Sequence, residues 1–142
     1  MRLWASAVTD AQDEIEPDVL IFVLYHSPDH PVALENSVGL QKCMVCIVNA
    51  YARSRNRGAN NVIIAHEFLH TLGATDKYDR SNGMPIAPHG LADPERSPRY
   101  PQTNAEIMGG RIPLAVDDAI TPANLGYVII GPLTAHEIRL AE

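Results

Sequence analysis

The sequence has little of the features that define two other classes of protein. It carries 11 Lys and Arg against 17 Asp and Glu, a formal net charge of −6, and has no basic patch that could hold a phosphate backbone. Nucleic acid is therefore not an expected partner. No apolar run approaches the roughly 20 residues that a membrane-spanning helix needs. We expect a soluble chain without a membrane span.

Cysteine is also scarce, with only 2 in the chain. Cys43 and Cys46 form a CxxC, but no second CxxC completes a tetrahedral metal site. Residues 45–51 have the pattern of a strand, in which residues three apart point to opposite faces. The two sulfurs then cannot reach one metal or each other, so we expect buried free thiols.

The length of 142 residues and a hydrophobic content of 46% favour one globular domain, residues 1–142. The apolar stretch at the start is too short for a signal peptide, and the N-terminus could be truncated. The compartment stays open, with secretion or a periplasmic location compatible with a truncated N-terminus. The oligomeric state is also open.

Three segments in the first half predict a small sheet. Residues 19–25 are a continuous apolar run, which indicates a central strand covered on both faces. Residues 44–51 and, more weakly, residues 37–41 predict further strands. We expect residues 37–41 to form an exposed sheet edge that can pair with an extended peptide.

The remaining elements are helices and one loop. Residues 3–14 have the spacing of an amphipathic helix, and Asn60 or Asn61 can cap the helix that follows the strands. Residues 77–105 are rich in proline and lack periodicity, which predicts a long ordered loop along one side of a cleft. A capping box from Thr134 to Glu137 predicts a short final helix.

The most specific signal is the motif HExxHxxGxxD over residues 66–76. On a helix, His66 and His70 lie on one face one turn apart, where both can bind a single cation. Glu67 then lies beside the cation, where it can take a proton from a water that the cation activates. Gly73 ends the helix, and the returning chain delivers Asp76 as a third ligand.

The third ligand has competitors in the sequence. Asp79 lies three residues beyond Asp76, and His89 and Glu106 follow in the loop and at its end. Each of these side chains is a donor that zinc accepts. Glu106 has the alternative task of anchoring the turn around Met108 through hydrogen bonds.

The motif, followed by Met108 in the segment AEIMGG, resembles the metzincin metallopeptidases and looks most like their small snapalysin-type members. The resemblance implies one catalytic Zn²⁺ held by His66, His70 and Asp76, with Glu67 as the catalytic base and a Met-turn at Met108. It also implies an α/β (α+β) fold. A small twisted mixed sheet and the active-site helix form an upper part, residues 1–73. An irregular proline-rich lower part with a short C-terminal helix follows, residues 74–142.

One departure from that family concerns the stabilisation of the oxyanion. Some members have a tyrosine two residues after the Met-turn methionine, where this chain has Gly110. Tyr78 and Tyr100 are the candidates that could replace it.

The sequence thus predicts a zinc-dependent endopeptidase that hydrolyses peptide bonds in peptide or protein substrates. The alternatives are a non-catalytic zinc-binding domain and an inactive metzincin-like module that binds a partner. A structural zinc site normally has four protein ligands, whereas the sequence offers three convincing ones and a glutamate that does not ligate.

Overall fold

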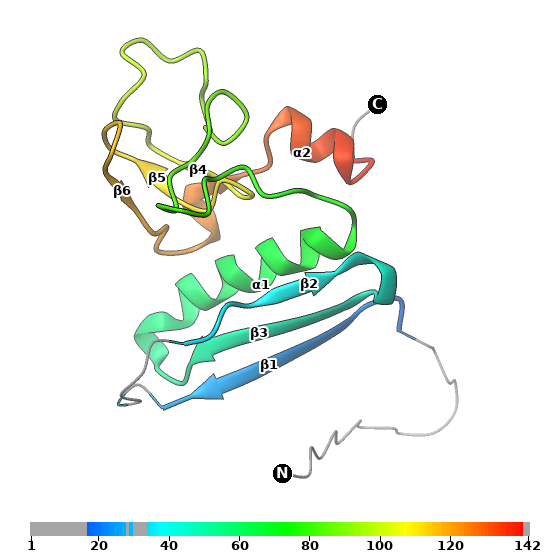
Figure 1. Cartoon of the computed structure of the whole chain (residues 1–142). Helices are drawn as coiled ribbons and strands as arrows, with labels where there is room; N and C mark the ends of the chain where they lie inside the picture. The colour runs from blue at the N-terminus through cyan, green and yellow to red at the C-terminus, as the bar shows by residue number, and fades with distance from the viewer. Residues whose placement is uncertain (1–16, 28, 30–33, 141–142) are drawn as a thin grey trace.

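The computed structural model of the chain describes residues 17–27, 29 and 34–140 and shows an α+β fold of two helices and small sheets. The helix α1 (Arg57–Thr71) lies between a three-stranded sheet and an irregular second half (Figure 1). The helix predicted over residues 3–14 lies outside the described residues. Among the described residues, no helix is long and apolar enough to cross a membrane.

The sheet contains β1 (Leu20–His26), β2 (Val38–Leu40) and β3 (Val45–Tyr51) in the order β1-β3-β2. β1 runs parallel to β3, and β2 runs antiparallel to it. The prediction of a mixed sheet is therefore confirmed. β2 lies at an edge, as expected for residues 37–41.

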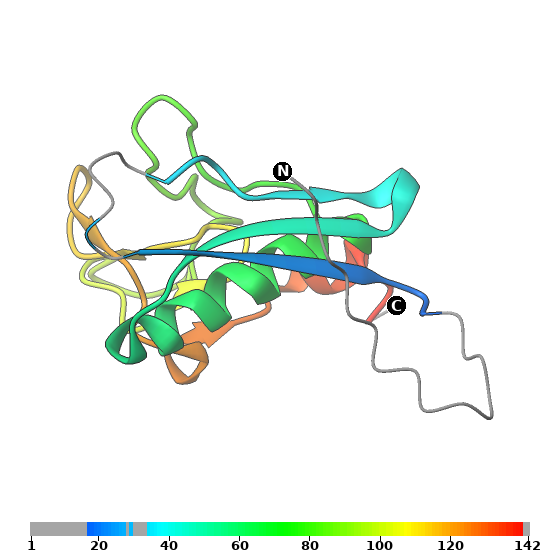
Figure 2. The ribbon, with the colours of Figure 1, turned by 90° about the horizontal axis from the view of Figure 1, so that it is seen from below.

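The prediction that residues 19–25 form a central strand covered on both faces is wrong. β3 is central because it pairs with both neighbours, and β1 lies at the other edge. In β1, Leu20 and Phe22 are each 45% exposed. They pair with Val45 and Ile47 of β3 and point to the sheet face away from α1. Figure 2 shows the arrangement of the sheet and α1 from below. A continuous apolar run does not tell whether a second layer covers the strand, and among the described residues α1 covers one face and no element covers the other.

The helix α1 begins earlier than predicted and ends as predicted. Its first residue is Arg57, so Asn60 is no cap; it is buried in the first turns and donates to the Tyr51 carbonyl at 3.0 Å. At the other end Gly73 has φ 104°, and the N–H of Ala74 donates to the Leu69 carbonyl at 3.0 Å. At this left-handed turn the helix ends and the chain reverses its direction.

The second half is mostly loop, as predicted for residues 77–105, and the loop is held by its own backbone hydrogen bonds. Two short strand pairs follow: β4 (Ala105–Glu106) with β7 (Val128–Ile129), and β5 (Ile112–Pro113) with β6 (Ala119–Ile120). Short 3₁₀ turns lie at Gln41–Cys43, Ser54–Asn56 and Leu125–Tyr127.

The short C-terminal helix is present as α2 (Pro132–Glu137), but the predicted capping box is wrong. The helix starts after Gly131 with Pro132 in its first turn. A proline is tolerated there because the backbone N–H groups of the first turn have no partner within the helix. Thr134 is fully buried and donates to Glu106 at 2.6 Å. Its hydroxyl therefore ties α2 to β4 instead of capping the helix.

A buried apolar cluster joins α1 to the second half. It consists of Leu69, Ala74, Ile107 and Met108, with Phe68 and Leu72 packed against it.

Cys46 is buried on the α1 side of β3, whereas Cys43 is exposed in a 3₁₀ turn, and both are free. The expectation of free thiols is confirmed, and that of a buried Cys43 is wrong because the chain turns before β3 begins.

The difference between the two faces of the fold is measurable with two leucines. Leu69→Ala should lower the free energy of unfolding by about 2–5 kcal/mol, because Leu69 is 6% exposed in the buried cluster. Leu24→Ala on β1, where Leu24 is 40% exposed, should lower it by about 1 kcal/mol or less. Urea unfolding with a chelator present, which removes linkage to metal binding, gives both values. Equal losses would contradict the exposure of this sheet face.

Candidate metal centre

The structure brings His66 and His70 of α1 together with Asp76 of the segment that follows the helix. Asp76 Oδ1 lies 3.3 Å from Nε2 of His66 and 3.0 Å from Nε2 of His70. Within the described part of the chain, this is the group of donor atoms that lie close enough together, all within 4.8 Å, to hold a metal ion. Ligands at about 2.0–2.1 Å in a tetrahedral zinc site lie about 3.3 Å apart, so two of the separations match such a site.

Both imidazoles are oriented by backbone carbonyls. Nδ1 of His66 lies 2.8 Å from the Ile107 carbonyl, and Nδ1 of His70 lies 2.8 Å from the Ala74 carbonyl. A carbonyl only accepts, so each Nδ1 carries a proton, and in the neutral form of each ring the lone pair of Nε2 is available to the centre. Metal-ligating histidines in proteins are held by this kind of second hydrogen bond.

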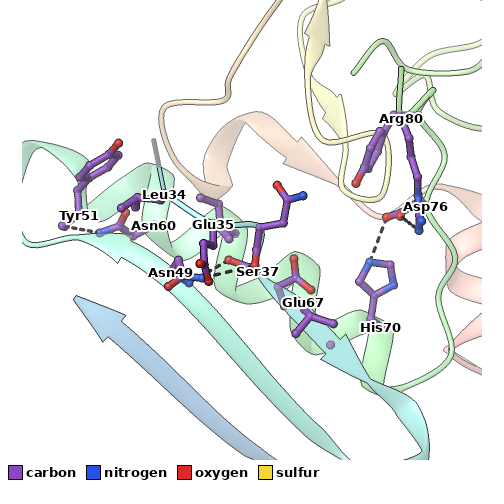
Figure 3. Close-up of a pocket in the computed structure, with 15 residues that line it drawn as sticks. Leu34, Glu35, Ser37, Asn49, Tyr51, Asn60, Glu67, His70, Asp76 and Arg80 are labelled. Atoms are coloured by element: carbon purple, nitrogen blue, oxygen red, sulfur yellow. Dashed lines mark hydrogen bonds and ion pairs between the residues drawn. The ribbon is translucent and has the colours of Figure 1, made fainter. Parts of the chain in front are cut away.

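The two carboxylate oxygens of Asp76 have different surroundings (Figure 3). Oδ2 accepts a hydrogen bond from the exposed Arg80 at 2.8 Å. Oδ1 is buried and lacks a hydrogen-bond partner among the described residues. The closeness of His66 and the ion pair with Arg80 hold the pKa of Asp76 well below its usual range. An anionic oxygen buried without a donor is what a bound cation would satisfy.

The residues on either side of Asp76 are clamped by α2. Glu137 accepts hydrogen bonds from the backbone and the hydroxyl of Thr75, at 3.1 and 2.7 Å. It also forms an ion pair at 2.7 Å with Lys77, which is only 5% exposed. The N–H of Lys77 in turn donates to the Met108 carbonyl at 2.9 Å. Asp76 is therefore held in place from both sides.

Glu67 lies beside the three donors and is 7% exposed. Burial raises its pKa, and the nearby histidines and the N–H of Gly39 partly offset the rise. A side chain at Gly39 would overlap the Glu67 carbonyl and come within 2.7 Å of the His70 Cβ atom. Glycine is therefore required here for β2 to approach α1 closely.

For His66, burial would lower the pKa, but its contacts with Asp76 and Ile107 and the charge of Glu67 raise it.

The competing ligands lie elsewhere. Asp79 is exposed and accepts from the backbone and hydroxyl of Ser81, and His89 is exposed in the loop. Glu106 is fully buried, and both its oxygens are already occupied. It accepts hydrogen bonds from the backbone of Met108, Gly109 and Gly131 and from the Thr134 hydroxyl, at 2.6 to 3.1 Å. Glu106 thus anchors the turn around Met108, the alternative task considered from the sequence.

Met108 is fully buried in the cluster beneath α1, in a tight turn closed by Gly110 with φ 75°. The Tyr78 ring lies 6.2 Å from the His66 ring between centroids, and burial raises the pKa of its phenol. Tyr78 therefore stands beside the centre. Tyr100 lines neither of the hollows described next.

Two hollows meet at Glu67. The larger, about 890 Å³, extends along β2 and β3 and is lined by Gly39, Glu67, His70, Asp76 and Arg80 among others (Figure 3). The smaller, about 270 Å³, lies on the side of His66 and the turn around Met108. Glu67, Tyr78 and Ile63 line both. The centre is thus open to solvent on two sides.

No protein-family model matches the chain, and no curated protein or solved structure matches it significantly.

Sequence reasoning missed three residues that shape the site: Gly39, Arg80 and Glu137. Arg80 lies four residues after Asp76, but on a loop that spacing carries no signal. Gly39 and Glu137 meet the motif only through the tertiary fold.

Two aspartates on one loop provide a matched test of the ligand set. Asp76→Ala should lower the affinity for zinc by at least about 100-fold, because it removes the buried donor oxygen that both imidazoles face. Asp79→Ala removes an exposed carboxylate that faces only Ser81 and should leave the affinity unchanged. Competition with a chromogenic chelator measures both affinities. Loss of zinc in Asp79→Ala with retention in Asp76→Ala would reverse the assignment.

Proposed function

We propose that the chain is a zinc-dependent endopeptidase of metzincin-like architecture, and the observation that supports this best is the buried, unsatisfied Asp76 Oδ1 between two imidazoles. Two neutral imidazoles and one carboxylate form a donor set suited to catalytic zinc, with room for a fourth ligand. When bound, zinc polarises the scissile carbonyl and acidifies water. His66, His70 and Asp76 would hold it.

Glu67 acts as the base in this proposal. Its carboxylate is held beside the centre by the close approach of β2. Its pKa is raised and therefore lies nearer to neutral pH than the pKa of an exposed glutamate. It takes the proton of the attacking water and delivers it to the nitrogen of the leaving amine. Tyr78, next to His66, donates a hydrogen bond from its phenol to the developing oxyanion.

The substrate lies along β2. The outer edge of this strand is unpaired in the described sheet, and Val38 and Gly39 line the larger hollow with Glu67. An extended peptide that pairs with this edge passes directly in front of the base. The backbone of the substrate thereby contributes to binding, and the scissile bond is placed by strand pairing.

The alternatives explain fewer of these features. A non-catalytic zinc site is closed by protein ligands, whereas the described residues offer three donors with hollows on either side. An inactive module that binds a partner gives the buried Glu67 no task, although a buried carboxylate is costly to maintain.

Glu67→Gln should abolish peptide hydrolysis while zinc stays bound. The amide keeps the size of the side chain but cannot accept the proton of the water, so kcat should fall by about 100-fold or more. Glu95→Gln, the same change at an exposed position that lines neither hollow, should leave kcat within about twofold. Zinc content by atomic emission and hydrolysis of casein measure the two effects. An active, zinc-loaded Glu67→Gln protein would refute the role of the base.

Strand pairing with β2 is testable on the substrate, which leaves the protein unaltered. A cleaved peptide is synthesised with single N-methyl groups along its backbone, each of which removes one amide donor. Methylation at alternate residues near the cut should raise KM about three- to tenfold per lost hydrogen bond, because alternate residues of a strand face the partner edge. A uniform response along the peptide would contradict pairing with β2.

A further inference from the structure

The smaller hollow has the size of a single side chain and a mixed lining. Its volume of about 270 Å³ is below the range of about 300–1,000 Å³ typical of pockets for whole small-molecule ligands. Val62, Ile63 and Ile107 form apolar walls, and Val62 and Ile107 are themselves buried. Glu67 lies where this hollow meets the larger one. A residue adjacent to the scissile bond can therefore extend a side chain into it.

Glycines keep this hollow open. A Cβ atom at Gly110 would have no atom within 4 Å, so this position faces open space, and Gly110 lines the hollow. Its φ of 75° disfavours any side chain there. Gly83, with φ 70°, also lines the hollow. Because it has no side chain, it leaves room for one charged group.

That group is the guanidinium of Arg111. It lies directly over Gly83, where an added Cβ atom would be 3.3 Å from the guanidinium carbon. Arg111 is exposed at the rim and, within the described part of the chain, has no ion pair or hydrogen bond from its side chain. Arg80 at the other hollow differs, because its charge is already paired with Asp76. The smaller hollow thus combines apolar walls with an unused cation.

We propose that the smaller hollow binds a carboxylate of the peptide next to the scissile bond and that Arg111 determines this specificity. The proposal rests on the endopeptidase function above and names its substrate class. A guanidinium binds a carboxylate through two parallel N–H···O hydrogen bonds, and the apolar walls fit the methylene groups of a glutamate side chain. The carboxylate can come from an acidic side chain or from the C-terminus of a short peptide.

The test uses a synthetic mixture of random peptides, prepared once with free C-termini and once with C-terminal amides, digested by the zinc-loaded protein. Mass spectrometry of the products identifies each cut. In the wild type, glutamate should exceed glutamine about three- to tenfold at one position next to the cut, as for a partly exposed charged hydrogen bond. Enrichment that persists in the amidated peptides identifies the side chain as the source. Enrichment confined to cuts at a fixed distance from free C-termini identifies the terminus.

Arginine variants separate the charge of Arg111 from its bulk. Arg111→Gln should remove the preference for the carboxylate, and Arg111→Glu should replace it with a preference for lysine. Arg99→Ala, an exposed arginine that lines neither hollow, is the control and should retain it. A cleaving wild type without acidic enrichment, or enrichment that survives in Arg111→Gln, would overturn the proposal.

A binding measurement covers a protein that does not cleave. The immobilised Glu67→Gln protein is exposed to the same peptide mixtures with zinc, and retained peptides are identified. Retention of carboxylate-bearing peptides that Arg111→Gln abolishes supports the site even if hydrolysis fails, and then only the endopeptidase function is lost. If the wild type shows no acidic enrichment at its cuts and no Arg111-dependent retention of carboxylate-bearing peptides, the carboxylate site is excluded.

Discussion

The candidate metal centre depends on the placement of one carboxylate oxygen, Asp76 Oδ1, against the Nε2 atoms of two histidines. A buried anion is costly unless donors or a cation satisfy it, and this one has no hydrogen-bond partner among the described residues, while the two imidazoles that it faces donate from Nδ1 to backbone carbonyls. The closing turn at Gly73 directs the chain back toward the histidines of α1, and the Ala74 carbonyl within that turn orients His70. One short segment therefore supplies a donor and fixes the orientation of another.

The second half of the chain serves this placement through two carboxylates, the half-buried Glu137 and the fully buried Glu106. Glu137 on α2 holds Thr75 and Lys77, the neighbours of Asp76. Glu106 is satisfied by four donors that join β4, the turn around Met108 and the start of α2. Its removal would leave several buried donors unpaired. The irregular half thus acts as a scaffold in which hydrogen bonds replace extended secondary structure.

The extent to which the sequence predicted this arrangement follows from separation along the chain. His66, His70, Gly73 and Asp76 lie within one helix and its closing turn, so local geometry predicts that they come together. Glu137 reaches Lys77 from 60 residues away. No local pattern signals such a contact. The apolar run of β1 was misread for a related reason, since whether other elements cover a strand depends on the whole fold, and the described residues leave one face of β1 exposed. The choice between Asp76 and Glu106 as ligand likewise required the tertiary hydrogen bonds of Glu106.

The central claim is that His66, His70 and Asp76 bind one zinc ion through nitrogen and oxygen and leave a position open. X-ray absorption at the zinc edge of the protein loaded with one equivalent of zinc tests it most directly. We predict a first shell of nitrogen and oxygen at about 2.0–2.1 Å with the scattering pattern of two imidazoles. A sulfur shell at about 2.3 Å, which Cys43 or Cys46 would supply, or a protein that takes up no zinc, would contradict it.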